Sequence, residues 1–188
     1  GDLDGDGDLD AIVTNANHDS YVGEPDRVYI NNAGTFVQGQ SLGNSVSSGI
    51  ALGDVDGDGD LDAFISTRGI LSEDLWLNNG DGTFVYQQVT GGVLSGWDVE
   101  LGDLDGDGDL DAVVASGRDS APSRIMFNDG AGIFTADSQA LTNYAMAVSL
   151  GDLDGDGDLD IVFETDNYVS PNNTPRAWIN NGSGSFTI

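Results

Sequence analysis

Four near-identical strings of ten residues constrain this sequence more than any other feature. Each string reads Gly-Asp-Leu/Val-Asp-Gly-Asp-Gly-Asp-Leu-Asp, and the copies begin at Gly1, Gly53, Gly102 and Gly151. The spacings between successive copies are 52, 49 and 49 residues. Self-similarity with a period of about 40–50 residues is typical of propellers and solenoids. The chain is therefore expected to repeat one supersecondary unit.

The segments between the strings have the pattern of short β-strands. An apolar, partly β-branched run follows each string and predicts a strand buried on both faces: Ala11-Ile12-Val13, Ala63-Phe64-Ile65, Ala112-Val113-Val114 and Ile161-Val162-Phe163. A second strand is expected over residues 27–30, 74–77, 124–127 and 176–179, each ending in an Asn/Gly turn. A Phe-centred strand follows each turn, at Phe36, Phe84, Phe134 and Phe186. An alternating strand precedes each later string, at Ile50/Leu52, Val99/Leu101 and Val148/Leu150.

This order gives blades of four antiparallel strands and predicts an all-β propeller. A β-sandwich with coincidental turns is the alternative. The first blade lacks its inner strand, so 15 strands are expected, either in a fragment of a larger propeller or in an assembly that completes the blade. We expect residues 1–188 to form one domain or segment, with repeats at approximately 1–46, 47–95, 96–143 and 144–188.

The charge is concentrated in the repeated strings. The chain has 33 acidic residues against five Arg and no Lys, for a net charge of −28, and 20 of those acids lie in the four strings. So uneven a charge favours cation binding over a generally acidic surface. It excludes nucleic acid and anionic membranes as partners, since both need a basic face. No apolar run reaches the roughly 18 residues of a membrane span, and the absence of Cys excludes disulfides and Cys-ligated zinc.

The strings have the spacing of a calcium loop. Counted from its first Asp, each acidic loop reads D-x-D-x-D-G-x-x-D, so carboxylates stand at positions 1, 3, 5, 7 and 9. Alternate carboxylates on a curled loop converge on one point, and Ca²⁺ takes six to eight oxygen ligands. At position 7 we expect the backbone carbonyl to bind while the side chain faces water. The predicted metal residues are Asp2, Asp4, Asp6, Asp8, Asp10, Asp54, Asp56, Asp58, Asp60, Asp62, Asp103, Asp105, Asp107, Asp109, Asp111, Asp152, Asp154, Asp156, Asp158 and Asp160.

Other loop types fit less well. Mg²⁺ prefers fewer protein ligands, and an EF-hand needs Glu at position 12, where this chain has Val13, Ile65, Val114 and Phe163. With Kd on the order of 0.1 mM and about 10 mM free Ca²⁺, each site would add roughly 2.7 kcal/mol of stability. Sites this weak would be empty at cytosolic Ca²⁺, so four Ca²⁺ ions and an extracellular or cell-surface location are expected.

These features resemble the FG-GAP/VCBS repeat family, which includes the integrin α-subunit propeller. The resemblance rests on the Leu-Gly-Asp strand end, the acidic loop and the Asn-Asn-Gly-x-Gly-x-Phe turn. It implies Ca²⁺ in the loop, blades around a central axis, and roles in adhesion, carbohydrate binding or surface structure. Trp97-Asp98 and Ser48-Gly49 stand where the integrin-type repeat has Phe-Gly, which places the chain nearer the VCBS branch.

Candidates for chemistry outside the loops are few. The single histidine, His18, has no marked catalytic partners, so no enzymatic activity is predicted. Trp76 and Trp178 are expected to pack between blades, whereas Trp97 could stack on a sugar from the variable face. That face could carry a further aromatic platform of Tyr21, Tyr144 and Tyr168. Asn172 and Asn181 begin sequons for N-glycosylation.

The leading functional hypothesis is an extracellular, non-enzymatic scaffold for adhesion or surface assembly. The scaffold repeats while the loops on the opposite face vary, so the variable face is where a protein or carbohydrate ligand is expected. Self-association that completes the first blade is a further expectation. The alternatives are a lectin-like propeller and an accessory propeller of a secreted polysaccharide-degrading enzyme.

Overall fold

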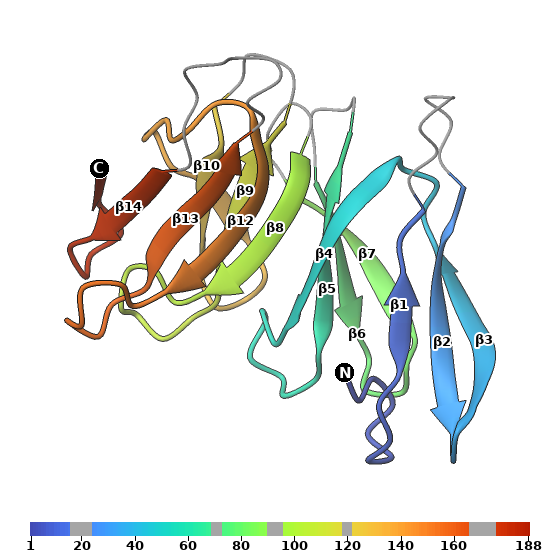
Figure 1. Ribbon diagram of the computed structural model, residues 1–188. Coiled ribbons are helices and arrows are strands. Elements are labelled where there is room, and N and C mark those ends of the chain that lie inside the picture. The colour runs from blue at the N-terminus through green and yellow to red at the C-terminus, as the bar shows by residue number, and fades with distance from the viewer. Residues whose placement is uncertain (16–23, 69–72, 90–95, 118–121, 166–175) are drawn as a thin grey trace.

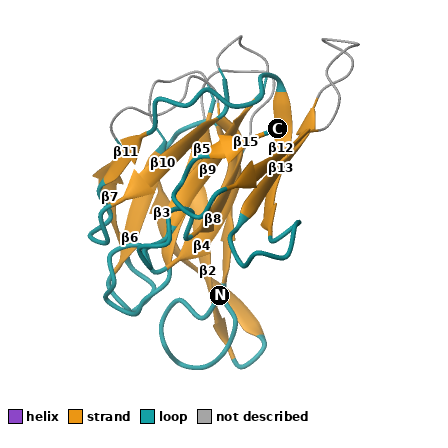
Figure 2. Ribbon diagram, turned by 90° about the vertical axis from the view of Figure 1, so that its left-hand side faces the viewer, coloured by secondary structure: helices purple, strands orange, loops and turns teal. Residues whose placement is uncertain are grey.

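The computed structural model describes residues 1–15, 24–68, 73–89, 96–117, 122–165 and 176–188. All regular structure in these ranges is β-strand (Figure 2). The described part of the chain accordingly holds no helix that could cross a membrane. The all-β prediction is confirmed.

In the described ranges, fifteen strands form four antiparallel sheets, each built from strands that are consecutive in the chain. The first sheet comprises β1 (Ala11–Val13), β2 (Asp26–Asn32) and β3 (Thr35–Leu42). The second comprises β4 (Ser47–Gly53), β5 (Asp62–Thr67), β6 (Asp74–Asn78) and β7 (Phe84–Gln88). The third comprises β8 (Gly96–Gly102), β9 (Asp111–Ser116), β10 (Arg124–Asn128) and β11 (Phe134–Ala136). The fourth comprises β12 (Ala145–Gly151), β13 (Asp160–Thr165), β14 (Arg176–Asn180) and β15 (Phe186–Thr187).

The sheets follow one another across the molecule as propeller blades (Figure 1). Their inner strands β4, β8 and β12 lie side by side. Ser48 Oγ on β4 donates a hydrogen bond of 2.8 Å to Gly96 O on β8, and Val148 N on β12 donates one of 3.1 Å to Asp98 Oδ2 on β8. The predicted propeller blades are confirmed, and the first has three strands.

The hydrophobic core lies between consecutive sheets because each middle strand is apolar on both faces. On β5, Ala63 and Ile65 pack against Leu3 of the first repeat, whereas Phe64 faces the third sheet. The rings of Phe64 and Phe134 meet edge to face with centroids 5.0 Å apart. A third cluster joins the last two sheets around Ile125, Ile161, Phe163 and Phe186. Each interface is therefore built by two repeats together.

Trp76 and Trp178 occupy the packing positions that were predicted for them. Trp76 packs against the core between the first two sheets, and its ring centroid lies 5.2 Å from that of Tyr86. Trp178 packs against the core between the last two sheets, where its indole N–H donates to Thr142 Oγ1 at 2.9 Å. The acidic loops all lie along one edge of the molecule, at the bottom of Figure 1.

Candidate metal centre

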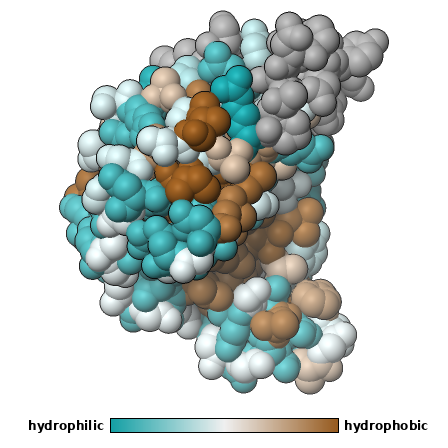
Figure 3. All heavy atoms as spheres, turned by 60° about the vertical axis from the view of Figure 1, so that its left-hand side comes forward, coloured by the Kyte–Doolittle hydropathy of each residue, from teal (hydrophilic) through white to brown (hydrophobic). Residues whose placement is uncertain are grey.

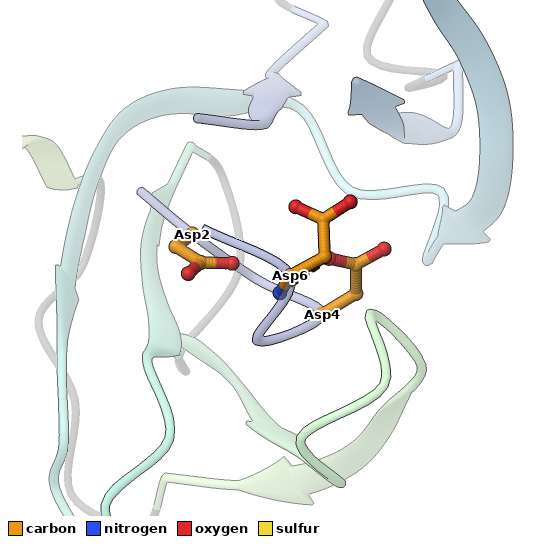
Figure 4. Close-up of side chains that lie close together, drawn as sticks. All are labelled: Asp2, Asp4 and Asp6. Atoms are coloured by element: carbon orange, nitrogen blue, oxygen red, sulfur yellow. Dashed lines mark hydrogen bonds between the residues drawn. The ribbon is translucent and has the colours of Figure 1, made fainter. Parts of the chain in front are cut away.

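In every acidic loop, three carboxylates come together. Within each group the nearest oxygen atoms lie within 4.8 Å of one another. The groups are Asp2/Asp4/Asp6, Asp54/Asp56/Asp58, Asp103/Asp105/Asp111 and Asp152/Asp154/Asp160. Figure 4 shows the first group on a single curl of the chain. Positions 1 and 3 contribute in all four loops, and position 5 or position 9 supplies the third carboxylate.

Glycines at positions 4 and 6 make the curl possible. Gly5 and Gly7 have φ of 73° and 94°, a region that residues with a Cβ rarely adopt, and the other three loops repeat this pattern. The N–H groups of Gly5 and Gly7 donate to the two oxygens of Asp2 at 2.9 and 3.0 Å. The same pair of bonds recurs at Asp54, Asp103 and Asp152. The position-1 carboxylate is thus the point around which the loop folds.

The position-9 carboxylate ties the loop to the sheet behind it. In loop 3, Asp111 is fully buried and accepts hydrogen bonds of 2.9 Å from Leu104 N and from Asn128 N. The equivalent pairs are present at Asp10, Asp62 and Asp160. Each carboxylate oxygen has a second lone pair, so this structural role leaves room for metal ligation. The sequence predicted the position-9 Asp as a metal ligand, but it did not predict these two hydrogen bonds to the sheet.

The position-7 side chain contacts the turn between the last two strands of its own sheet. Asp8 Oδ2 accepts a 3.0 Å hydrogen bond from Ala33 N, so this side chain, which was expected to face water, also contacts the protein. At Asp60, the carboxylate lies so close to Gly80 that a methyl group on that glycine would come within 2.5 Å of Oδ2. The acidic loops and the Asn/Gly turns share one edge of the propeller, as the sequence predicted.

The electrostatics of the loops favour a cation. The pKa of the position-3 carboxyl is raised at Asp4, Asp56, Asp105 and Asp154, chiefly through desolvation and further through repulsion by neighbouring carboxylates. Burial raises the pKa of Asp62 and of Asp111 to about 6, against their hydrogen bonds from backbone N–H groups. A divalent cation would relieve both penalties. Oxygen donors alone also suit a hard cation such as Ca²⁺.

Several predicted candidates lie elsewhere. His18, Tyr21, Tyr168 and Asn172 are outside the described residues, so their predicted roles stay predictions. Trp97 is half-buried and has the Arg68 guanidinium 3.8 Å from its ring centroid, so this ring face is already covered. Asn181 is exposed in the last turn, as a glycan acceptor must be. Tyr144 is half-buried and has φ of 57°.

Two sets of buried polar residues were missed by the sequence analysis. The first is Asn78, Asn128 and Asn180, which end the third strands. The sequence pattern marks them as turn residues, and their recurrence before each turn is the signal that distinguishes them. The second is Asp26, Glu73 and Ser123, each of which accepts a backbone N–H from the end of the preceding strand or just beyond it. These three share a position but no residue type, so no sequence pattern identifies them.

Comparisons with known proteins place the chain. No curated protein matches it. Among solved structures, the chain is similar to a lectin from Agrocybe aegerita that recognises non-reducing terminal N-acetylglucosamine, with a TM-score of 0.58 and 22% sequence identity. The match covers 95% of this chain and 50% of the lectin, so the chain spans about half the length of that protein, and the likeness supports the fold. The family model for the FG-GAP-like repeat matches residues 2–65, 72–114 and 103–163. The chain therefore belongs to the FG-GAP-like repeat family.

Proposed function

We propose that the chain is a calcium-stabilised β-propeller module that acts as a non-enzymatic scaffold for adhesion or surface assembly outside the cell. The observation that carries this proposal is the repeated cluster of carboxylates, present in all four loops and bonded to the sheet behind it. Cations held there would neutralise charge that the loops otherwise concentrate. They would also fix the edge at which consecutive blades meet.

The ligands proposed for each Ca²⁺ are the Asp residues at positions 1, 3, 5 and 9 with the carbonyl at position 7. The groups within 4.8 Å supply the first of these oxygens, and the remaining Asp can complete the six to eight that Ca²⁺ takes. Solvent-exposed acidic loops are expected to bind Ca²⁺ in the extracellular range of affinity, which supports an extracellular or cell-surface location. Trp97-Asp98 in place of Phe-Gly supports the VCBS branch of the family.

Carbohydrate binding is the second candidate function, and the structural likeness to the Agrocybe aegerita lectin favours it. The variable edge opposite the acidic loops is where we would place the ligand. Trp97 is a weaker candidate for stacking on a sugar than the sequence suggested, because Arg68 covers one face of its ring. An accessory propeller of a secreted polysaccharide-degrading enzyme is a third candidate. We also propose that Asn181 and Asn172 can carry N-glycans.

A binding assay separates the first two functions. The labelled chain is applied to immobilised extracellular-matrix proteins and to glycans with different terminal sugars, in about 5 mM Ca²⁺ and in excess chelator. Chelator-sensitive binding to proteins that free sugars do not displace supports the adhesion scaffold. Displacement by free N-acetylglucosamine supports the lectin. Binding that is equal with and without Ca²⁺ contradicts the proposed role of the metal.

Assembly is tested by the mass of the particle in solution. Within the described residues β1 has a strand partner, β2, on one side only, so its other edge can pair with a strand of a second copy. We expect particles larger than one chain by light scattering in Ca²⁺, dispersed by chelator. A particle of single-chain mass at all protein concentrations contradicts self-association without affecting the calcium proposal.

A further inference from the structure

We propose that Asn78, Asn128 and Asn180 couple the Ca²⁺ affinities of successive acidic loops. The inference rests on the proposed calcium binding and adds a route by which occupancy of one loop affects the next. Each asparagine is the last residue of the third strand in its sheet (β6, β10 or β14) and is at most 6% exposed. A buried amide in this place must find partners, and it finds them in two different loops.

The side-chain amide of each asparagine bridges two repeats. Asn128 Nδ2 donates to Val55 O at position 2 of loop 2, at 2.7 Å, and to Leu110 O at position 8 of its own loop 3, at 3.1 Å. Asn78 repeats the arrangement between loops 1 and 2, and Asn180 repeats it between loops 3 and 4. One side chain thus holds the backbone of two consecutive acidic loops.

The backbone of the same residue continues the path to a candidate metal ligand. Asn128 N donates to Oδ1 of Asp111, the position-9 carboxylate of loop 3, at 2.9 Å. At the other end, the position-2 carbonyl lies between the position-1 and position-3 ligands of the preceding loop. A cation that fixes the carboxylates of one loop therefore fixes a peptide group two hydrogen bonds away from a ligand of the next loop.

The boundary between the second and third repeats has a further hydrogen bond. Gly132 N donates to Val55 O at 3.0 Å, so this carbonyl accepts from two groups of the following sheet. Without a cation, the carboxylates of a loop repel one another and the loop must be ordered before it can bind. A cation bound in one loop also orders part of the adjacent loop. The adjacent loop then loses less conformational entropy on binding, and its Ca²⁺ affinity is higher.

The first repeat provides a matched control within the chain. Asn31 occupies the same place, donates from its backbone N to Asp10 Oδ1 at 2.7 Å, and donates from its side chain to Leu9 O at 3.1 Å. No described residue of a preceding loop contacts it. Asn31→Ala therefore removes side-chain bonds to Leu9 O and Gly34 N, both within the first repeat, and leaves every boundary between repeats intact.

The test measures Ca²⁺ affinity separately at each loop. The glycines at position 6 (Gly7, Gly59, Gly108 and Gly157) donate to the position-1 carboxylate, so their amide resonances in the ¹⁵N-glycine-labelled chain are expected to shift as each loop is filled. We expect the double substitution Asp105→Asn/Asp107→Asn, which disables loop 3, to weaken Ca²⁺ binding at loops 2 and 4 by at least about 5-fold. Loop 1, which shares no boundary with loop 3, is expected to change less.

The asparagine variants then test whether the asparagine side chain carries this coupling between adjacent loops. In Asn180→Ala, disabling loop 3 is expected to leave the affinity of loop 4 unchanged within about 2-fold, while loop 2 still responds. In Asn31→Ala, the coupling between loops 3 and 4 is expected to be that of the wild type. Such a double-mutant cycle compares affinities with and without loop 3, so a general loss of stability does not produce the expected pattern.

Each other outcome has its own meaning. Unchanged affinities at loops 2 and 4 after loop 3 is disabled would overturn the coupling, whether or not Asn180→Ala folds. Coupling that persists undiminished in folded Asn180→Ala would overturn the role of the asparagine. If no glycine resonance shifts up to about 10 mM Ca²⁺, the proposed calcium binding itself has failed, which is a different result from uncoupled binding.

Discussion

The loops that face a following sheet differ from the last loop, although their sequences are nearly the same. Position 2 is Leu104 in loop 3 and Leu153 in loop 4. Leu104 is 1% exposed because it packs into the core with the fourth sheet, whereas Leu153 is 51% exposed. The first sheet shows the converse, since Phe36 is 55% exposed while the equivalent Phe134 is 3% exposed. Identical residues are buried or exposed according to the neighbouring repeat.

This comparison shows that the repeats are not independent folding units. Loops 1 to 3 each insert an aliphatic side chain (Leu3, Val55 or Leu104) into the core with the next sheet, and each later sheet places its Phe against the sheet before it. Apolar surface is visible on the side of the molecule that carries the fourth sheet (Figure 3). Burial, and with it most of the stability, belongs to the boundaries between repeats.

The largest difference is expected between the equivalent phenylalanines. Phe134→Ala removes a ring that packs against Phe64 at 5.0 Å, and we expect it to cost about 3–5 kcal/mol in the free energy of unfolding. Phe36→Ala should cost less than about 1 kcal/mol, because more than half of this side chain is already exposed. Urea unfolding in Ca²⁺ measures both. Equal losses would mean that Phe36 is covered in solution.

The position-2 side chains provide the next comparison. Leu104→Ala leaves a cavity in the core between the last two sheets and is expected to cost about 2–4 kcal/mol. Leu153→Ala should stay within about 0.5 kcal/mol of the wild type. The same unfolding experiment applies. A large loss at Leu153 would show that this side chain is buried against a partner.

The glycine before each acidic loop also contacts the following repeat, where one is present. A methyl group on Gly102 would lie 2.7 Å from Leu159 Cδ1 and 2.9 Å from Leu150 Cδ1, so Gly102→Ala is expected to cost about 1–3 kcal/mol. A methyl group on Gly151 meets nothing within 4 Å, so Gly151→Ala should be neutral or slightly stabilising. A thermal melt of the two variants is sufficient. The reverse order would contradict the packing described here.

The smallest effect, when it is measured over a single pH unit, concerns pH at the opposite edge. Glu73 is fully buried, accepts from Thr67 N at 2.7 Å, and burial raises its pKa from 4.5 to about 8. The folded state therefore binds a proton that the unfolded state releases, and stability falls as pH rises between about 4.5 and 8, by up to about 1.4 kcal/mol per pH unit. Ser123 fills the same role in the third repeat without a charge.

Glu73→Gln tests this pH dependence. The amide cannot ionise, so the variant should lose the fall in stability between pH 6 and pH 7 that the wild type shows. Unfolding free energies at the two pH values, at constant Ca²⁺, provide the measurement. A wild-type protein with no fall over this range would show that Glu73 is ionised in the folded state.

The fold could be predicted almost completely from the sequence. The acidic strings fix the repeat, the apolar triplets such as Ala63-Phe64-Ile65 fix a strand buried on both faces, and the Asn/Gly turns fix the hairpins. The carboxylate positions of the candidate site were predicted in the same way, because the spacing of the Asp residues alone brings them together.

What could not be predicted depends on contacts between repeats. Asn128 resembles any turn residue until the preceding loop is placed against it, and Asp8 resembles a solvated side chain until the turn at Ala33 is present. The acceptors Asp26, Glu73 and Ser123 share a structural position. The connections before them vary in sequence, so this shared position cannot be recognised from the sequence. A local pattern specifies a strand or a loop, but it does not show which other repeat will cover a side chain.

The most direct test of the proposed metal role is calorimetric melting of the chain over a range of Ca²⁺ concentrations, from excess chelator to about 10 mM, with Mg²⁺ at the same concentrations as a control. Four sites with Kd on the order of 0.1 mM would together add about 11 kcal/mol at the highest concentration. We therefore predict that Tm rises by more than about 20 °C in Ca²⁺ and much less in Mg²⁺. A Tm that is the same in chelator and in Ca²⁺ would contradict the claim that the acidic loops are metal sites holding the propeller together.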